Sequence, residues 1–511
     1  MAAMRRIALL PLLFATYVVA GPTPPLAPDV PASFTPPGHQ ADYERREVMI
    51  PMRDGVKLFT VIFIPKGAKH APILLTRTPY NAAKRGERSA STHLADVLPQ
   101  MDDQIAADGG YIRVFQDVRG KYGSEGDYVM TRPLRGPLND SAVDHSTDAY
   151  DTIDWLVKNV KESNGKVGMI GSSYEGFTVL MALVRPHPAL VVAVPECPMV
   201  DGWLGDDWFH AGAFRQVNFD YFTGQTMARG EGKAVPRTGH DDYAGFLRAG
   251  SAGDFARAAG LDQLPWWKKM TEHPAYDAFW QGQALDRALA AQPLTVPTMI
   301  VASLWDQEDS YGWSAVYAAL APKDKTGLLH LVLGPWRHSG ANYDAPSLGI
   351  LRFDADTALQ FRRDVLKPFL DQHLKDRAPK ASTPPVVAYE TGTNAWRKLA
   401  RWPIGKPRAL YLEPAGRAEW AAPKVGGFDE YVSDPAKPVP YLPRPVRFED
   451  RDAWKTWLVS DQRAVVDRPD VLAWQTEALT QPVQIAAAAP GSSRSRASSS
   501  RRLPEATSGF G

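Results

Sequence analysis

The residues of this chain best suited to chemistry are a serine, an aspartate and a histidine, met in that order. Ser173 lies in Gly171-Ser-Ser-Tyr-Glu-Gly176, where a short apolar run enters a turn flanked by glycines and helix-like sequence follows. This strand–turn–helix context is typical of a nucleophile elbow, which exposes a serine on a sharp bend. A serine at this place can also simply cap the helix. The pentapeptide alone leaves both interpretations open.

Asp306 and His338 each follow the end of a later apolar run, at 296–302 and 328–333. In an open α/β sheet the C-terminal ends of the strands meet at one crevice. A serine hydroxyl needs a neutral imidazole to take its proton, and the imidazole needs a carboxylate to fix its tautomer. The order Ser173, Asp306, His338 is that of α/β-hydrolases and predicts a catalytic triad. The alternative for His338 is an ordinary core or surface histidine.

The tetrahedral intermediate of such a reaction needs hydrogen-bond donors for its oxyanion. The backbone N–H of Tyr174, directly after the serine, is one donor that the elbow supplies. The phenol of Tyr80, at the end of an early strand, is a second candidate, although an aromatic residue at the edge of the core explains it too. Cys197 is the only cysteine and lies in a strand-like run, so we expect a buried inert thiol. We expect neither a metal nor a cofactor.

Strand-like and helix-like segments alternate in the first part of the chain, and the strands are continuously apolar. An Asp-Gly turn at 53–55 between two alternating runs predicts a β-hairpin. Residues 150–159 are expected to form a helix. This pattern predicts an α/β fold, with a parallel sheet covered on both faces. Residues 201–290 lack strand-like runs and are rich in aromatic residues, which predicts a helical cap inserted over the site.

The sequence pattern changes after a long amphipathic helix predicted at 355–374. From residue 379 the sequence consists of short β-rich pieces separated by Pro and Gly, as in an all-β domain. We therefore expect a hydrolase domain at 39–378 and a β domain at 379–485. Residues 486–511 have no periodicity and are expected to be disordered.

The composition is that of a globular protein of two or three domains, with 511 residues, 44% hydrophobic residues and a net charge of +1. Such a charge gives no reason to expect nucleic acid or a membrane surface as partner. Residues 1–20, with two arginines before an apolar run too short to span a bilayer, are typical of a secretory signal; an uncleaved anchor is the alternative. We therefore expect a periplasmic or secreted protein with no membrane contact after signal removal. A Pro-rich arm follows at 21–38.

Several motifs together resemble the CocE/X-Pro dipeptidyl-peptidase superfamily of serine hydrolases. They are the serine motif 171–176, Arg77-Thr-Pro-Tyr80, Asp117-Val-Arg-Gly120, Trp305-Asp-Gln-Glu-Asp309 and Gly334-Pro-Trp-Arg-His338. Within this group the chain is most similar to the α-amino acid ester hydrolases, some of which are known as glutaryl-cephalosporanate (glutaryl-7-ACA) acylases. The resemblance implies the same triad, with Tyr80 and the Tyr174 amide as the oxyanion hole.

The resemblance also implies a site for the substrate's ammonium group at Asp207, Glu308 and Asp309. Physically, three carboxylates beside an acyl pocket repel one another and favour a bound cation. Most acidic clusters are solvated loop charges, and that remains the alternative. The expected function is hydrolysis of α-amino acid esters and related amides through an acyl-enzyme, with acyl transfer to β-lactam amines as a side activity.

Three other functions stay open. Two belong to the same fold, an X-Pro dipeptidyl peptidase and a general aryl esterase. The third is a catalytically dead, exported binding protein. Relatives form tetramers, so a homo-oligomer is expected. The resemblance implies a β domain that is a full jelly roll in the relatives. Here recognisable sequence stops near Ile485, and the tail resembles out-of-frame coding. A truncated jelly roll with unpaired edges and an exposed apolar face predicts poor solubility.

Overall fold

The structure is a computed structural model, and it describes residues 28–35, 40–107, 110–205, 207–210, 212–403, 406, 408–432 and 434–486. The expected signal peptide, most of the Pro-rich arm and the tail from 487 lie outside the described residues. The chain divides into two compact units, Met1–Gln40 and Ala41–Gly511. All helices and strands that the structure describes belong to the second unit.

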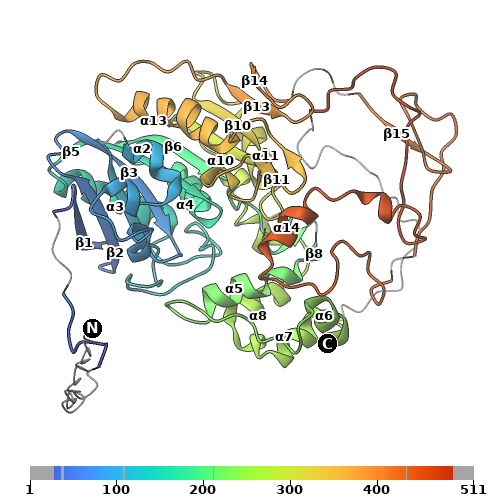
Figure 1. Cartoon of the computed structure of the whole chain (residues 1–511), viewed down its shortest axis with the longest axis horizontal. Coiled ribbons are helices and arrows are strands. Elements are labelled where there is room, and N and C mark those ends of the chain that lie inside the picture. Colours follow the sequence, from blue (N-terminus) through green and yellow to red (C-terminus); the bar gives the residue numbers. More distant parts are fainter. Residues whose placement is uncertain are drawn as a thin grey trace, which may run out of the picture. The chain divides into compact units, whose positions relative to one another are not determined.

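A ten-stranded sheet forms the centre of this unit (Figure 1), in the order β1-β2-β4-β3-β5-β6-β9-β10-β13-β14. Its strands are β1 (Tyr43–Pro51), β2 (Lys57–Pro65), β3 (Ala71–Thr78), β4 (Ile112–Asp117), β5 (Ser163–Ser172), β6 (Leu190–Glu196), β9 (Thr298–Trp305), β10 (Leu329–Arg337), β13 (Val386–Glu390) and β14 (Ala395–Leu399). The strands from β4 to β13 run parallel, whereas β1, β2 and β14 pair antiparallel with their neighbours. The expected α/β fold and the hairpin at 53–55 are confirmed.

Both faces of the sheet are buried, which explains the continuously apolar strands. Side chains alternate between two cores: Ile73 and Leu75 of β3 pack into one, and Leu74 packs into the other. The elements around the sheet are η1 (Ala82–Gly86), α1 (Leu94–Val97), η2 (Gln100–Asp102), α2 (Asp103–Ala107), α3 (His145–Asn159), α4 (Tyr174–Val184), α11 (Gly312–Leu320), η5 (Gly340–Asn342), α12 (Thr357–Phe361), the π-helical turn η6 (Arg362–Leu366) and α13 (Lys367–Leu374). Helices α3, α4 and α11 pack in the first core, and α12 and α13 in the second.

Helix α3 begins five residues earlier than the expected start at residue 150. The cause is a capping box, in which the Asp144 carboxylate accepts the Thr147 N–H at 2.9 Å and the Thr147 hydroxyl accepts the Asp144 N–H at 2.8 Å. The expected single helix at 355–374 is continuous but contains the π-helical turn η6 in its middle.

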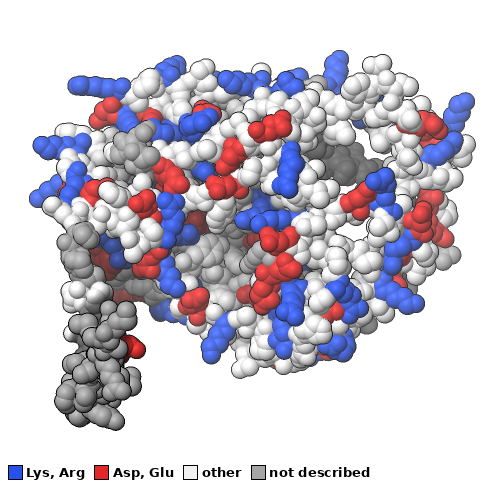
Figure 2. Space-filling view, in the orientation of Figure 1, with Lys and Arg blue, Asp and Glu red and all other residues white. Residues whose placement is uncertain are grey.

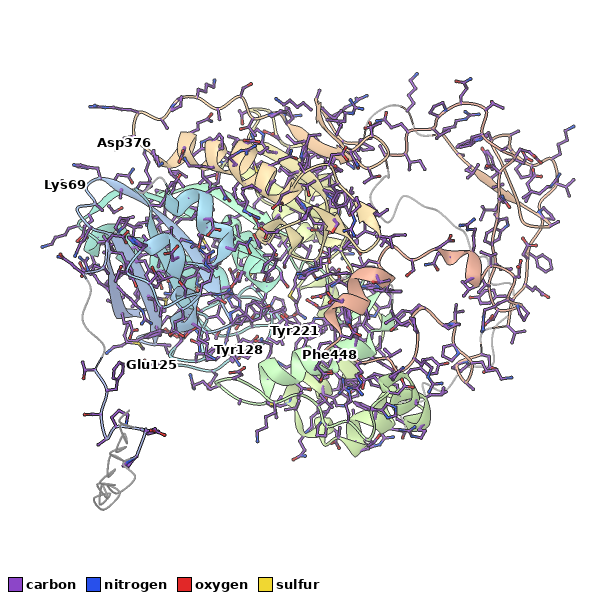
Figure 3. All side chains as sticks on the ribbon, viewed as in Figure 1. Lys69, Glu125, Tyr128, Tyr221, Asp376 and Phe448 are labelled. Carbon is purple, nitrogen blue, oxygen red and sulfur yellow. The ribbon has the colours of Figure 1, made fainter. Side chains whose placement is uncertain are left out.

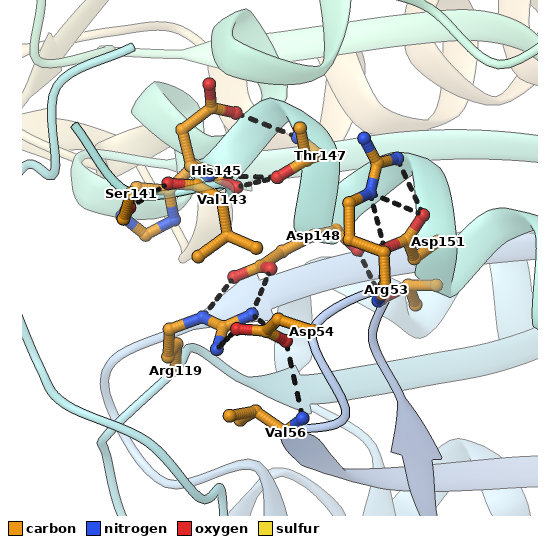
Figure 4. Close-up of polar contacts among 12 residues, drawn as sticks. Arg53, Asp54, Val56, Arg119, Ser141, Val143, His145, Thr147, Asp148 and Asp151 are labelled. Atoms are coloured by element: carbon orange, nitrogen blue, oxygen red, sulfur yellow. Dashed lines mark hydrogen bonds and ion pairs between the residues drawn. The ribbon is translucent and has the colours of Figure 1, made fainter. Parts of the chain in front are cut away.

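Ion pairs fix the β1–β2 hairpin to helix α3 (Figure 4). Arg53 of the turn pairs with Asp151 at 2.7 Å. Arg119, which follows β4, pairs with both Asp54 of the turn and Asp148 of the helix, each at 2.7 Å. The Asp-Val-Arg-Gly motif therefore has a structural role, because its arginine joins three separate segments.

Residues 201–290 form the expected helical insertion, in which α5, α6, α7 and α8 lie together, whereas α10 lies beside α11 (Figure 1). Its elements are β7 (Phe209–His210), β8 (Ala213–Phe214), η3 (Gln216–Asn218), α5 (Phe219–Thr226), α6 (Asp242–Ala249), α7 (Ala252–Ala258), η4 (Leu261–Gln263), α8 (Pro265–Glu272), α9 (Ala278–Gln281) and α10 (Leu285–Ala290). Aromatic rings fill its interior, with Phe219 packed against Phe222, Phe255 and Trp267.

The domain boundary that we expected at residue 378 falls inside the hydrolase sheet. Strand β13 pairs parallel with β10, and β14 pairs with β13. The first β-rich piece, at 385–389, thus continues the hydrolase domain and does not begin a second one. Sequence pattern did not reveal this because a short apolar strand looks the same in either domain.

After β14 the described residues contain little regular structure. The remaining elements are α14 (Arg451–Trp457), η7 (Gln462–Ala464) and a two-stranded sheet of β15 (Tyr411–Glu413) and β16 (Arg417–Glu419); a further two-stranded sheet, β11 (Ser347–Leu348) and β12 (Leu351–Arg352), comes earlier in the chain. Large apolar side chains are exposed in this region, including Val425, Phe428, Val432 and Ile485. An exposed apolar surface was expected here.

The visible face of the molecule carries acidic and basic side chains interspersed, without a large patch of one sign (Figure 2). In the part of the chain that the structure describes, none of the helices has both the length and the apolar character needed to cross a membrane.

Candidate active site

The serine of the Gly-x-Ser-x-Gly motif occupies a sharp bend between strand β5 and helix α4. Ser173 has φ 62° and ψ −125°, a conformation that costs a non-glycine residue about 1–3 kcal/mol. Its N–H donates to the Glu196 carbonyl at 3.0 Å, which fixes the bend against β6. A side chain at Gly176 would lie 2.7 Å from that same carbonyl oxygen, so this position requires glycine. The sequence therefore forms the elbow that we predicted.

Asp306 and His338 meet at the ends of β9 and β10. His338 Nδ1 lies 2.9 and 3.0 Å from the two carboxylate oxygens of Asp306. The N–H groups of Glu308 and Asp309 also donate to Asp306 Oδ1, at 2.8 and 2.9 Å. Burial would raise the pKa of Asp306, but the His338 charge and these donors hold it below its ordinary value.

The elbow and the histidine loop are joined by a direct hydrogen bond. Ser172 Oγ, on the residue before the candidate nucleophile, lies 2.7 Å from Ser339 Oγ, on the residue after the histidine. Ser339 adopts a left-handed conformation, with φ 57°. Cys197 is buried, as expected, and its sulfur contacts Ser303 Oγ at 3.2 Å.

The other ring nitrogen of His338 faces acidic groups. His338 Nε2 lies 3.4 Å from Glu308 Oε2 and 3.9 Å from Asp309 Oδ2. Burial by itself would lower the pKa of His338, but the charges of Asp306, Glu308 and Asp207 together raise it to about 9. Among the described contacts there is no hydrogen bond between His338 and Ser173. The imidazole is thus paired with carboxylates on both nitrogens.

Asp207 comes from the cap and completes the acidic group. Its Oδ2 is buried without a hydrogen-bond partner, and Oδ1 accepts from Asn218 Nδ2 at 3.3 Å. Burial raises the pKa of Asp207 to about 7, and the Glu308 charge adds to the effect. A buried carboxylate that repels its neighbour is stabilised by a bound cation. Asp207, Glu308 and Asp309, expected as one group, do lie around the same imidazole.

Tyr80 contacts the serine. Its hydroxyl interacts with Ser173 and lies 3.2 Å from the hydroxyl of Tyr221. Burial raises the pKa of Tyr80, so the phenol remains protonated and able to donate. Tyr174 is the first residue of α4, and N–H groups in the first turn of a helix lack intrahelical partners. Its side chain is buried against His145, so only its amide faces the chemistry.

Sequence reasoning missed Tyr221, which lies in the cap near Tyr128 (Figure 3). No motif marks it, because Tyr221 is one of several aromatic residues at the start of helix α5. The bond between Ser172 and Ser339 was also missed, although both residues adjoin predicted catalytic ones. Gln307 is a third such residue: its side chain donates to Glu308 at 2.9 Å, and its carbonyl accepts from Arg215 at 2.6 Å.

The sheet order, the strained serine and the Asp306–His338 pair define the chain as an enzyme of the α/β-hydrolase class. More particularly, the X-Pro dipeptidyl-peptidase family (S15 family) matches residues 54–340, and the chain belongs to this family.

Similar proteins support the same assignment. The cocaine esterase of Rhodococcus sp. (strain MB1 Bresler) is 31% identical over 467 residues, which cover 86% of this chain and 75% of the esterase. A solved α-amino acid ester hydrolase, labelled with selenomethionine, is 65% identical with a TM-score of 0.85, over 91% of this chain and 77% of that chain. An aminopeptidase from the marine sediment archaeon Thaumarchaeota archaeon is 53% identical with a TM-score of 0.83, over 89% and 76%. The resemblance inferred from the motifs is confirmed.

Proposed function

We propose that this hydrolase cleaves esters of α-amino acids, and that Asp207, Glu308 and Asp309 bind the ammonium group of the substrate. The observation that carries the proposal is the unpartnered, buried Oδ2 of Asp207 beside the Glu308 charge. An ammonium group offers three donors and a positive charge, and charge-assisted hydrogen bonds contribute about 1.5–3 kcal/mol each. The 65% identity to an α-amino acid ester hydrolase supports the same substrate class.

In the proposed reaction, His338 accepts the Ser173 proton as Oγ attacks the ester carbonyl. The oxyanion accepts hydrogen bonds from the Tyr80 hydroxyl and the Tyr174 amide. When the tetrahedral intermediate collapses, the C–O bond to the alcohol breaks and His338 returns the proton to the leaving oxygen. Water then repeats the sequence on the acyl-enzyme. An amine in place of water would give acyl transfer, which is how β-lactam amines would be acylated.

Substrate binding would also prepare the base in this scheme. His338 Nε2 is paired with Glu308, and this pairing favours the protonated imidazole, which cannot accept a proton. A substrate ammonium bound between the carboxylates would replace the positive charge with which the protonated His338 now neutralises them. The imidazole can then release its proton to solvent and turn toward Ser173. An ester without an ammonium group would find the base protonated at neutral pH.

The experiment compares, at pH 7, the methyl esters of phenylglycine and phenylacetic acid, which differ only in the amino group. We expect kcat/KM to be at least about 100-fold higher for the amino ester, as two or three charge-assisted hydrogen bonds require. Equal values for the two esters would overturn the proposal and leave a general aryl esterase.

A peptidase is the second candidate, because the same ammonium site would accept the N-terminus of a peptide. The 53% identity to an aminopeptidase favours it. Chromogenic amides of single amino acids and of X-Pro dipeptides separate these activities from ester hydrolysis. A kcat/KM on an amide equal to that on the amino ester would make the peptidase the principal function.

For location, the signal-like residues 1–20 support export to the periplasm or the medium.

A further inference from the structure

Glu175, two residues after Ser173, has no part in the reaction proposed above, yet its charge is buried. It lies in the first turn of helix α4, and its side chain is only 6% exposed. Its carboxylate forms an ion pair with the guanidinium of Arg85, at the end of η1. A buried charge is costly unless it is paired. This pair therefore connects the helix that begins beside the nucleophile to a distant loop.

Arg85 in turn contacts the segment that carries Tyr80. Its Nη2 donates to Thr78 Oγ1 at 3.2 Å, and that hydroxyl oxygen also accepts the N–H of Tyr80 at 3.0 Å. The guanidinium carbon lies 5.9 Å from the centre of the Tyr80 ring. The Arg85 guanidinium thus holds Tyr80 in two ways. It binds Thr78, which accepts the Tyr80 N–H, and it lies over the Tyr80 ring.

The same segment has two further anchors. Thr178 of helix α4 donates to the carbonyl of Arg77 at 3.1 Å. Asp117, at the end of β4, accepts the N–H of Ala82 at 2.6 Å. Residues 77–86 leave the sheet at β3, and these contacts, together with that of the Tyr80 hydroxyl to Tyr221, determine where Tyr80 lies. The contacts to Thr178 and Glu175 fix the segment that carries Tyr80 relative to helix α4.

We propose that the Glu175–Arg85 ion pair positions the oxyanion hole, holding the Tyr80 hydroxyl at the correct distance from Ser173 and the Tyr174 amide. The inference rests on the proposed function, because it assumes that Tyr80 donates to the oxyanion. The two donors come from different elements. Glu175 adjoins the Tyr174 amide, whereas its partner Arg85 holds Tyr80. A misplacement of about 1 Å in such an arrangement can cost on the order of 100-fold in rate. Glu175 and Arg85 are positioning residues and touch no substrate.

A double-mutant cycle tests this role. Glu175→Gln is made in the native chain and in Tyr80→Phe. The values of kcat and KM are measured with a p-nitrophenyl ester that has no amino group, at a pH above 9, where His338 is deprotonated without a bound ammonium. We expect Glu175→Gln alone to lower kcat by about tenfold with KM changed by less than about twofold. In the Tyr80→Phe background the further loss should be less than about twofold, because the donor to be positioned is gone. An equal loss in both backgrounds, or none in the native chain, would overturn the inference.

Arg85→Lys repeats the cycle with the positive charge retained. Lysine lacks the forked guanidinium, so we expect a kcat loss of about threefold that again disappears in Tyr80→Phe. A loss that persists there would contradict the inference. The control is Glu162→Gln, which removes an ion pair with Arg46 at the other end of β5 and should leave kcat unchanged. Melting temperatures show whether each variant folds.

The cycle separates this inference from the proposed function. If Tyr80→Phe has the full native kcat, Tyr80 is not an oxyanion donor, and both the proposed role and this inference fail. If Tyr80→Phe is impaired but the two changes are additive, only the positioning role fails. A failure of ammonium recognition would not affect the result, because the ester used carries no amino group.

Discussion

Ser172 and Ser339 are joined by a 2.7 Å hydrogen bond between their hydroxyl groups. The bond connects the residue before the candidate nucleophile, at the end of strand β5, with the residue after the candidate base, which follows strand β10. It therefore limits how far Ser173 and His338 can move apart. His338 is paired with carboxylates on both ring nitrogens, so in the proposed reaction this bond keeps the base near the nucleophile until a substrate releases it.

Ser172→Ala should weaken this connection without removing a reacting group. We expect kcat to fall by about three- to tenfold, and the free energy of unfolding to fall by about 1 kcal/mol, because Ser339 loses its partner. Urea unfolding and steady-state kinetics measure the two effects. Ser91→Ala removes an exposed hydrogen bond to Asp96 and should change neither quantity appreciably. An unchanged kcat in Ser172→Ala would show that the bond does not position the site.

The pH dependence should depend on the amino group of the substrate. Carboxylates raise the pKa of His338 to about 9, and only the deprotonated ring accepts a proton, so activity on phenylacetate methyl ester should rise as pH rises through about 9. Glu308→Gln removes the carboxylate 3.4 Å from Nε2, and should move this rise to lower pH by about 1 unit or more.

For the amino ester, the rise in kcat should occur at lower pH than for phenylacetate methyl ester. The bound ammonium neutralises the carboxylates, and kcat reports the enzyme–substrate complex. Rises at the same pH for both substrates would contradict the idea that substrate binding releases the base.

Asp306→Asn should abolish most activity without unfolding the protein. An amide cannot stabilise the imidazolium and favours the wrong tautomer of His338. We expect kcat to fall by about 10⁴-fold, the size of this effect in a serine protease. The rate of Ser173 labelling by a fluorophosphonate should fall in parallel. Labelling at the native rate would show that His338 does not act with Asp306.

Gly176→Ala should destabilise the elbow, because its Cβ would lie 2.7 Å from the Glu196 carbonyl oxygen. Such overpacking costs about 1–3 kcal/mol. Gly245→Ala is the matched control, since Gly245 lies within helix α6 with nothing in 4 Å of its would-be Cβ. That change should stabilise the protein by about 0.5–1 kcal/mol. Equal thermal shifts for the two variants would mean that the elbow can relax around a methyl group.

The sequence was most informative where a motif and its structural context coincide. The serine motif indicated an elbow because an apolar run, a glycine turn and a helix pattern followed one another. Asp306 and His338 could be placed because parallel strands end at one edge of the sheet. Their contact at 2.9 Å agrees with this topology.

Other features depend on contacts between distant segments, which periodicity does not encode. Strand β13 was assigned to a second domain because its pattern does not reveal that β10 is its neighbour. The Tyr80–Tyr221 contact joins the hydrolase domain to the cap. Glu175 stood inside the most informative motif, yet its partner Arg85 could be found only in the folded chain. Such pairings are decided by tertiary packing.

The central claim is that the acidic group around His338 selects substrates by their ammonium group, and Asp207 tests it most directly. The measurement is the ratio of kcat/KM for phenylglycine methyl ester to that for phenylacetate methyl ester, in the native chain and in Asp207→Asn. Asp262→Asn, an exposed position in the cap, is the control. We predict that the ratio falls by at least about tenfold in Asp207→Asn, mainly through a lower kcat/KM for the amino ester, and is unchanged in the control. An unchanged ratio in Asp207→Asn would contradict the account.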